Sequence, residues 1–485
     1  MTALSELLPA GGAGKVMDFV ASGTLPNGKA VVLKGDGTVE VIVQTTATQS
    51  VGTTTQFHST SVNYNGAAFD INSGKVVIAY RNNSNSNGTA IVGTVSGTSI
   101  SFGTAVVFSS SAGSYISVAA DPVNGKVVIA YQGSGGHGKS RVGTVSGTSI
   151  SFGTEVAFRG AASVLDIAIV YEKSSGKFVI AYRDNPNSLQ GTAIVGTISG
   201  TSISFGTSVV FETGDTYWIV MASSDDYKVV IAYSDNNNTN NGTAIVGTVS
   251  GTSISFGTAA VFNTGSIISF VGIGYDTNND KFVITFRDSN NGNYATAIVA
   301  TLSGTSISFG TSVVFWSGNS TQMAVVYDPV AEKIVIFYDD NTGDSAFIVG
   351  TVSGTSISFA TAVLFDSSVG KFFAPTYDSL NRKTVVAVKA GVNENGYATV
   401  IELASVTSNL TSTNFVGITT EAISNTATGS ITLQGGVSTN QSSLTSGSTY
   451  YVQADGTVST VSTAPAVNIG KALNATTLKL KGLSV

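Results

Sequence analysis

The sequence predicts an all-β protein, in which a seven-bladed β-propeller is joined to a small β domain formed by both termini. The first observation is a heptapeptide, SGTSISF, which occurs six times at intervals of 50, 53, 51, 53 and 50 residues. A period near 50 residues is typical of propellers and other repeat folds. The second observation is that no segment shows the 3.6-residue apolar spacing of a helix. The six copies begin at Ser96, Ser146, Ser199, Ser250, Ser303 and Ser353.

One repeat unit, residues 61–108, contains four predicted strands. The first is the extended run SVNYNGAAFD, residues 61–70, and the turn INSG follows it. The second, KVVIAY, residues 75–80, is apolar throughout, which predicts burial on both faces. The third, TAIVGTV, spans residues 89–95, and the fourth, ISFGTAVVF, spans residues 100–108 with apolar side chains at alternate positions. Four antiparallel strands in about 50 residues form one propeller blade.

Seven copies of the second strand indicate seven blades. The seventh unit has three strands but lacks a good fourth one. The segment SVGTTTQF, Ser50–Phe57, resembles the fourth-strand segment SFGTAVVF, Ser101–Phe108. Because a propeller ring must close, we expect Val51–Phe57 to complete the last blade. The seven second strands begin at Lys75, Lys126, Lys177, Lys228, Lys281, Lys333 and Lys383.

The segments outside the ring, at the two ends of the chain, resemble each other. GKAVVLKGDGTVEVI (Gly28–Ile42) matches GSTYYVQADGTVSTV (Gly447–Val461), with an Asp-Gly pair at the same place in each. Asp-Gly between extended runs is a strong hairpin signal. The predicted organisation is therefore a propeller over residues 49–406 and one small β domain that combines residues 1–48 with residues 407–485.

The composition excludes several classes of function. The 485 residues include 23 Lys and Arg, spread thinly in a chain of net charge −6, so the sequence lacks the basic patch that nucleic acid requires. The absence of cysteine excludes disulfides, thiolate zinc sites and cysteine nucleophiles. No apolar run approaches the ~18 residues of a membrane helix, and the opening MTALSELLPAGGAGKV lacks the pattern of a signal peptide. We expect neither a nucleic-acid partner nor membrane insertion.

Few motifs suggest catalysis, and we expect no enzyme activity and no cofactor. GSGGHGKS (Gly133–Ser140) fits the phosphate-loop pattern, but a strand rather than a helix is predicted to follow it. His58 and His137 are the only histidines, and we expect both to be solvated loop residues rather than parts of a zinc site or a triad. An acidic residue recurs five positions before the second strand, where it would cap a turn. These residues are Asp70, Asp121, Glu172, Asp276, Asp328 and Asp378.

The repeats differ mainly in two kinds of loop, those between the second and third strands and those that join one blade to the next. In a propeller both kinds lie on one face and the SGTS turns lie on the other, and binding residues are often carried by variable loops. The alternative is that the uniform turns only record recent duplication. The Asn/Asp-rich loops either offer oxygen ligands to calcium or are plain solvated loops. The two tryptophans either stack on a ligand or are buried between blades. The candidate ligand-binding residues are Asn82, Asp184, Trp218, Asp235, Asp288, Trp316 and Asp340.

The SGTSISFGT repeats, the opening FVASGTLPNGKAVVLKGDGTVEVI and the end FVGITTEAISNTATGSITLQGGVSTNQSSLTSGSTYYVQADGTV resemble virion proteins of tailed bacteriophages, especially tail-fibre and other appendage proteins. The resemblance implies a structural or host-attachment role and assigns no functional residues. We expect the protein in the virion, made in the host cytoplasm, with other virion proteins and a host-surface glycan or receptor as partners. Avidity would come from a homo-oligomer, such as a trimer through the terminal domain. Alternatives are a capsid decoration or head fibre and, from other classes, a glycan-degrading enzyme or a secreted lectin or adhesin.

Overall fold

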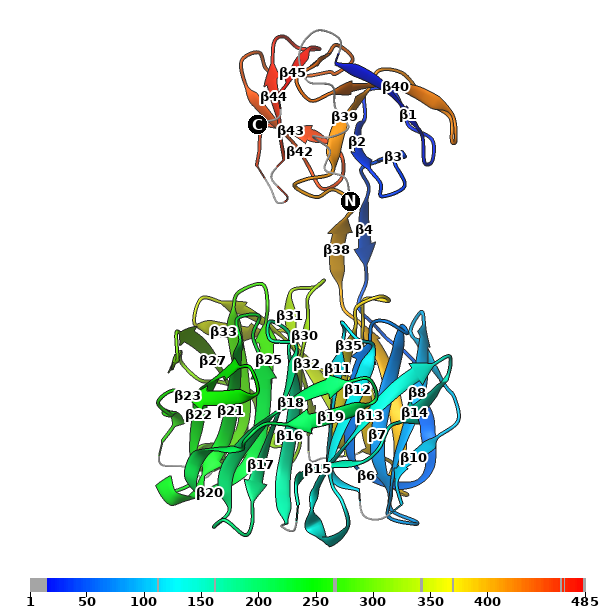
Figure 1. The fold of residues 1–485 in the computed structure, drawn as a ribbon. Coiled ribbons are helices and arrows are strands. Elements are labelled where there is room, and N and C mark those ends of the chain that lie inside the picture. The colour runs from blue at the N-terminus through cyan, green and yellow to red at the C-terminus, as the bar shows by residue number, and fades with distance from the viewer. Residues whose placement is uncertain are drawn as a thin grey trace. The chain divides into compact units, whose positions relative to one another are not determined.

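The computed structural model describes residues 15–110, 113–160, 163–264, 268–340, 343–368, 370–462, 465 and 467–482. Within these ranges the chain is built from strands, apart from short 3-10 turns such as η1 (Ser134–Gly136). The prediction of an all-β protein is confirmed. The strands form two compact units (Figure 1). The unit Thr48–Leu403 is a β-propeller, and Met1–Ala47 combines with Ala404–Val485 in a second unit, which we call the terminal unit.

The inner strands of the propeller stand around one central channel. Each inner strand contacts the inner strand of the next sheet, and the last contacts the first. Among the described residues, β6 and β20 are each shared between two sheets, because the first half of each strand forms the outer edge of the preceding sheet. The inner strands are β6 (Thr55–Asp70), β11 (Ser114–Asp121), β16 (Val164–Glu172), β20 (Val209–Ser223), β25 (Ile268–Asp276), β30 (Met323–Asp328) and β35 (Lys371–Asp378).

The second and third strands of each sheet form the core. In the first sheet β7 (Lys75–Asn82) pairs with β8 (Asn87–Ser96) in the register Val77↔Val92. The second strands are covered by neighbouring sheets on both faces, which explains why they are apolar throughout and why Tyr80 is fully buried. Burial of each large side chain contributes about 1.5–3 kcal/mol. The other second and third strands are β12 (Lys126–Gln132) and β13 (Gly138–Ser146), β17 (Lys177–Asp184) and β18 (Gln190–Ser199), β21 (Lys228–Asp235) and β22 (Asn241–Ser250), β26 (Lys281–Asp288) and β27 (Tyr294–Ser303), β31 (Lys333–Asp339) and β32 (Ser345–Ser353), and β36 (Lys383–Ala390) and β37 (Asn395–Glu402).

The outer strand of a sheet is broken in two, and the break explains the uniform repeat. In the first sheet β9 (Ser99–Phe102) and β10 (Val106–Ser109) both pair with β8. At the break, a Cβ added to Gly103 would lie less than 3.0 Å from the carbonyl oxygen of Thr148, in the SGTS turn of the next sheet. Only glycine lets the two sheets approach so closely. The same contact recurs in the pairs Gly52–Thr98, Gly153–Thr201, Gly206–Thr252, Gly257–Thr305 and Gly310–Thr355.

One copy of the repeat departs from this pattern, at Ala360 in SGTSISFAT. The sheet that follows it contains β35, β36 and β37 and has no SGTS turn, because the chain leaves the propeller after β37. Alanine is therefore found at a break in the outer strand that has no SGTS turn of a following sheet to contact. Packing between sheets thus gives the glycine at the break a structural reason to recur, which recent duplication alone does not supply.

The outer edge of this last sheet is formed by the beginning of the propeller chain. β37 pairs with β5 (Ser50–Val51) through Ile401↔Val51 and with the start of β6 through Ala398↔Thr55. The ring of Phe57 packs on Gly396. This contact is equivalent to that of Phe108 on Gly88 in the first sheet.

The alternation of strand direction gives the propeller two distinct faces. We call the face with the second-to-third-strand loops and the sheet-to-sheet connections the loop face, and the face with the SGTS turns the turn face. The acidic residues before the second strands lie in turns on the turn face. Asp70 accepts the backbone N–H of Asn72 and Asp378 that of Leu380, so these residues cap turns as predicted. The chain enters at Thr48 and leaves at Leu403, both on the turn face.

The terminal unit contains two five-stranded sheets with the same topology. The first has the order β1-β40-β39-β2-β3 and the second the order β41-β45-β44-β42-β43, so the corresponding strands follow in the same order along the chain. We call them the first and second modules. The first consists of β1 (Val16–Val20), β2 (Ala30–Leu33), β3 (Val39–Val41), β39 (Phe415–Thr419) and β40 (Thr428–Leu433). The second consists of β41 (Val437–Ser438), β42 (Thr449–Val452), β43 (Val458–Ser459), β44 (Val467–Ala472) and β45 (Leu478–Leu480).

The two modules differ in one connection. In the second module the chain passes directly from β43 to β44, whereas in the first the propeller lies between β3 and β39. Two further strands, β4 (Gln44–Ala47) and β38 (Ser405–Ser408), pair with each other and carry the chain to the propeller and back.

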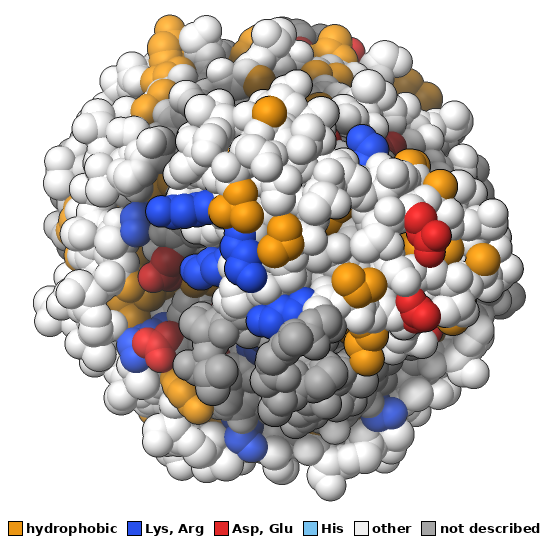
Figure 2. Space-filling model, turned by 90° about the horizontal axis from the view of Figure 1, so that it is seen from above, with side chains coloured by type: hydrophobic (Ala, Val, Ile, Leu, Met, Phe, Trp, Pro, Cys, Tyr) orange, Lys and Arg blue, Asp and Glu red, His pale blue; other side chains and the backbone are white. Residues whose placement is uncertain are grey.

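In the second module Lys471 and Lys479 lie opposite each other on β44 and β45. Figure 2 shows basic side chains gathered on the face that is seen from above.

Candidate ligand site at the channel mouth

The predicted loop residues lie on the loop face, but their oxygens are used by the loops themselves. Asp184 is buried at the end of β17 and forms an ion pair with Arg159 at 3.1 Å. Asp235 is also buried and accepts the backbone N–H groups of Asn237 and Asn238 at 3.1 and 3.3 Å. Burial is the main cause that raises the pKa of Asp235 above its ordinary value. The Asp184 carboxylate is thus occupied by an arginine, and the Asp235 carboxylate caps its own loop.

The remaining predicted loop residues behave in the same way. Asn82 accepts the backbone N–H and the hydroxyl of Ser84 at 3.0 and 2.6 Å. Asp288 accepts the backbone N–H of Asn290 at 3.1 Å. Asp340 accepts two backbone N–H groups of its own loop. Among the described residues, no group of three or more histidine, aspartate or glutamate side chains could hold a metal ion.

The two tryptophans have different environments. Trp316 lies in β29 (Val313–Asn319), packs against Tyr338 with ring centroids 5.9 Å apart, and has its indole nitrogen buried. Trp218 lies in β20, in the bulge at the loop-face end of its inner half, is 37% exposed, and packs at a tilt against Phe270 with ring centroids 4.4 Å apart. Of the two, Trp218 offers the surface that a ligand could reach.

Trp218 belongs to a set of equivalent residues around the channel. Six inner strands contain a β-bulge at their loop-face ends, and each bulge holds a residue with φ between 46° and 57°. Left-handed backbone costs about 1–3 kcal/mol for a bulky residue and is concentrated at functional sites. In the β30 sheet Gln322 occupies the equivalent place. We call the seven residues the mouth ring: Tyr64, Tyr115, Asp166, Trp218, Phe270, Gln322 and Phe372.

Members of the mouth ring touch from sheet to sheet. The Tyr64 ring lies 5.1 Å from that of Tyr115 and 5.2 Å from that of Phe372, measured between centroids. The side-chain oxygen of Gln322 accepts the backbone N–H of Phe372 at 3.3 Å. The ring therefore presents mostly aromatic surface around the loop-face opening of the channel. Below it, a cavity of about 470 Å³ is lined mainly by apolar inner-strand residues such as Ala67, Val118, Val170 and Ala222.

Cations from the ends of second strands support the aromatic groups at the mouth. Arg287 lies 4.7 Å above the Phe270 ring, and Lys389 lies 5.7 Å above that of Phe372. Arg183 lies 3.8 Å above the Tyr217 ring. Contacts of this kind are worth about 0.5–2 kcal/mol each. They hold the aromatic groups in place before any ligand arrives.

Asp166 is the only charged member of the mouth ring. Burial raises the pKa of its carboxyl to about 6, although the charge of Arg183 and the backbone N–H of Trp218 act in the opposite direction. Tyr115, on its other side, has a pKa raised by burial and then by the charge of Asp166. Asp166 thus stands between Tyr115 and Trp218 in the order of the mouth ring, because β16 lies between β11 and β20.

The other predicted motifs do not form catalytic arrangements. The loop GSGGHGKS continues directly into the strand β13, and Lys139 pairs with Glu155 at 3.0 Å. His58 is not a solvated loop residue, because it lies partly buried in β6 and bonds Tyr80 and Thr60 at 3.2 and 2.9 Å. Burial lowers the pKa of His58. Across the described ranges, no helix has the length and apolarity needed to cross a bilayer.

The mouth ring has a signal in the sequence, although the comparison of loops between repeats does not find it. In most repeats its members stand six positions before the acidic residue that caps the turn, as Tyr64 does before Asp70. An aromatic side chain recurs there in five of the seven units. The bulge that turns these side chains toward the mouth leaves no such mark in the sequence.

No protein-family model matches the chain, and no curated protein matches it. The solved structures that resemble the chain include the following three. Sqt1 of Saccharomyces cerevisiae is 11% identical with a TM-score of 0.45, covering 73% of this chain and 99% of that one. The SapL1 lectin in complex with alpha methyl fucoside is 14% identical with a TM-score of 0.41, covering 64% and 97%. AofleA from Arthrobotrys oligospora is 6% identical with a TM-score of 0.41, covering 70% and 96%. These matches assign neither a family nor a function.

Proposed function

We propose that the protein is a non-enzymatic glycan-binding protein whose ligand site is the mouth ring on the loop face. The observation that carries this proposal is the exposed indole of Trp218 in a preorganised ring of aromatic side chains. Flat aromatic surfaces suit the apolar faces of sugar rings, while polar loop groups can bond hydroxyls. Backbone held by bulges and side chains held by cations lose little entropy on binding.

The proposal includes the architecture that presents this site. The propeller is a closed ring of seven blades, and Val51–Phe57 completes the last blade. The pairing of β37 with β5 and β6 supports this closure. The site then lies opposite the face where the chain enters and leaves the propeller.

We further propose that the protein works as an appendage of a tailed-phage virion, in a symmetric oligomer. The support is the resemblance of the repeats and of both ends to virion proteins. Many copies on one particle would turn individually weak glycan contacts into firm attachment. Gold-labelled antibody on intact particles tests the location: label at tail fibres is expected, and label on the capsid shell would point to a decoration instead.

A pair of variants in one blade tests the binding site. Trp218→Ala is expected to reduce binding to a glycan array or to host cells at least tenfold, because it removes the exposed stacking surface. Tyr227→Ala is the matched control, since Tyr227 is 49% exposed, has left-handed backbone like Trp218, and lies on the turn face of the same sheet. Equal losses in both variants, or loss only in Tyr227→Ala, would contradict the assignment.

A further inference from the structure

The mouth ring is not symmetric, and its one charged member marks a distinct position. Five members are aromatic and one is Gln322, but Asp166 places a carboxylate between Tyr115 and Trp218. Asp166 has left-handed backbone with φ of 46°. Aspartate tolerates this backbone better than most residues. The bulge therefore fixes the carboxylate at the channel mouth.

The neighbouring cation is already committed to another carboxylate. Arg183 donates to Asp215 from Nε at 2.9 Å and from Nη2 at 2.6 Å, and its guanidinium stacks on Tyr217. Asp215 also accepts the side-chain amide of Asn236 at 2.9 Å. In the part of the chain that the structure describes, Asp166 forms no ion pair within 4.0 Å. The charged and titratable groups that act on it are Arg183, Asp215 and Tyr115.

A carboxylate in this setting favours a ligand that brings a positive charge. Burial penalises an ionised carboxylate unless a cation or enough hydrogen-bond donors compensate it. The raised pKa of Asp166 shows that Arg183 and the Trp218 N–H compensate only part of the penalty. The neighbouring aromatic side chains, Tyr115 and Trp218, can also attract a cation through their quadrupoles. One small cationic group could therefore contact a carboxylate and two aromatic groups together.

We propose that the site between Tyr115, Asp166 and Trp218 binds the protonated amine of an amino sugar in the glycan. This inference rests on the proposed glycan-binding function and specifies its ligand class. The sugar ring stacks on Trp218, and its ammonium group pairs with Asp166. An acetylated amine has no charge to offer and is bulkier, so the site selects the free amine over its N-acetyl form.

Calorimetry with two matched oligosaccharides tests this selection. The probes are a glucosamine tetramer and its fully N-acetylated counterpart, titrated into the full-length protein at pH 7. We expect at least tenfold tighter binding of the free-amine tetramer. Asp166→Asn should abolish this preference, with Asp166→Ser as a second variant if the first fails to fold. Asp288→Asn, which alters a carboxylate that caps its own loop, should keep it. In the wild type the preference should shrink as the pH falls from 7 to 5.

Different failures have different meanings. Equal binding of both tetramers, or a preference that survives in Asp166→Asn, overturns the amine site but leaves the glycan-binding proposal standing. Binding to other glycans on an array, with neither tetramer bound, has the same meaning. Binding of no glycan at all overturns the proposed function itself. A lysine-containing peptide that binds as tightly as the free-amine tetramer would show that the partner is a protein, and would overturn the amino-sugar assignment.

Discussion

Asp166 combines left-handed backbone with a partly buried charge, and both features cost free energy in the unbound protein. The pKa of its carboxyl is about 6 in the folded protein, against an ordinary value of 3.8. The folded chain thus holds the proton more tightly than the unfolded chain. The resulting stabilisation is complete below pH ~4 and is lost as the pH rises through about 6.

Replacement of this residue should change how stability depends on pH. Asp166→Asn keeps an acceptor for the Trp218 N–H and cannot ionise, so its free energy of unfolding at pH 7.5 should exceed that of the wild type by about 1–3 kcal/mol. At pH 4 the two proteins should be nearly equal. Urea unfolding at both pH values measures the difference, and a difference that does not vary with pH would contradict the burial of an ionisable Asp166.

At the scale of one element, the broken outer strand sets the spacing between neighbouring sheets. Gly206 lies so close to the carbonyl oxygen of Thr252 that no room is left for a Cβ, whereas Ala360 faces no SGTS turn. The φ of Gly206 is outside the left-handed region, so alanine at this position meets only the steric clash.

Two reciprocal variants separate this contact from a general effect of glycine. Gly206→Ala should lower the free energy of unfolding by about 1–3 kcal/mol, as overpacking typically does. Ala360→Gly should lower the free energy of unfolding by at most about 1 kcal/mol, because glycine adds backbone entropy to the unfolded chain. Denaturant midpoints of both variants measure this. Similar small shifts in both would show that the sheets do not interlock through the glycine.

The element scale also shows what a sequence can and cannot predict. The apolar second strands and the alternating outer strands are predictable because their burial determines their periodicity. Asp184 and Asp235 resemble ligand residues because a sequence shows an oxygen but not the N–H groups or the arginine that occupy it. Asp166 shares the spacing of the mouth ring, six positions before Glu172, but its place at the mouth depends on a bulge and so on strand register, which the sequence does not show. Trp218 is predictable as a loop-face aromatic, and its role in binding stays a prediction.

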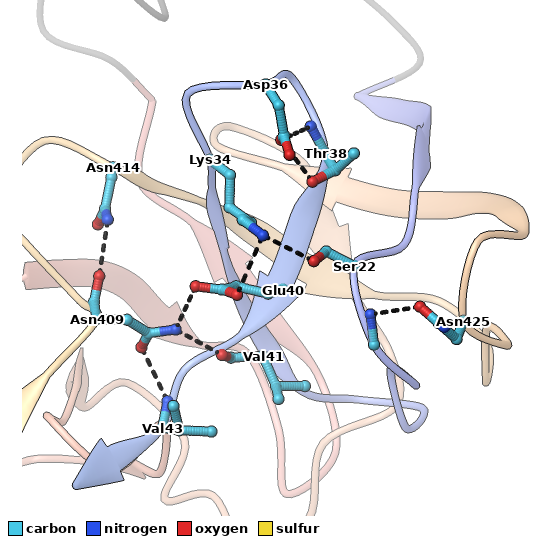
Figure 3. Close-up of polar contacts among 11 residues, drawn as sticks. Ser22, Lys34, Asp36, Thr38, Glu40, Val41, Val43, Asn409, Asn414 and Asn425 are labelled. Atoms are coloured by element: carbon cyan, nitrogen blue, oxygen red, sulfur yellow. Dashed lines mark hydrogen bonds and ion pairs between the residues drawn. The ribbon is translucent and has the colours of Figure 1, made fainter. Parts of the chain in front are cut away.

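At the scale of the whole molecule, the terminal unit is two copies of one module, and the propeller is inserted into the first. Asn409, which directly follows β38, bonds to β3 and to the chain just after it at the insertion point (Figure 3). Its side chain accepts the N–H of Val43 at 2.9 Å and donates to Glu40 and to the carbonyl of Val41, each at 2.9 Å. Asn414 donates to the Asn409 carbonyl at 2.8 Å.

This organisation predicts that the terminal unit folds without the propeller. Ala47 and Ser405 are register partners on β4 and β38, so an Asn-Gly pair in place of residues 48–404 would close a two-residue hairpin. The shortened chain should unfold cooperatively and keep a β-sheet circular dichroism spectrum. The separate fragment 48–403 should also fold, because it has its own core. A shortened chain that is unfolded or aggregated would show that the first module needs the propeller.

Because the entry and exit strands are adjacent, the whole propeller could be replaced by another domain. The β4–β38 pair holds its two chain ends one strand spacing apart, and everything beyond that pair is a single continuous cassette. A recombination event, or a designer, need join only two neighbouring points to graft another domain there. If the propeller selects the host glycan, such a replacement could change the specificity of an entire particle. The terminal unit would stay unchanged.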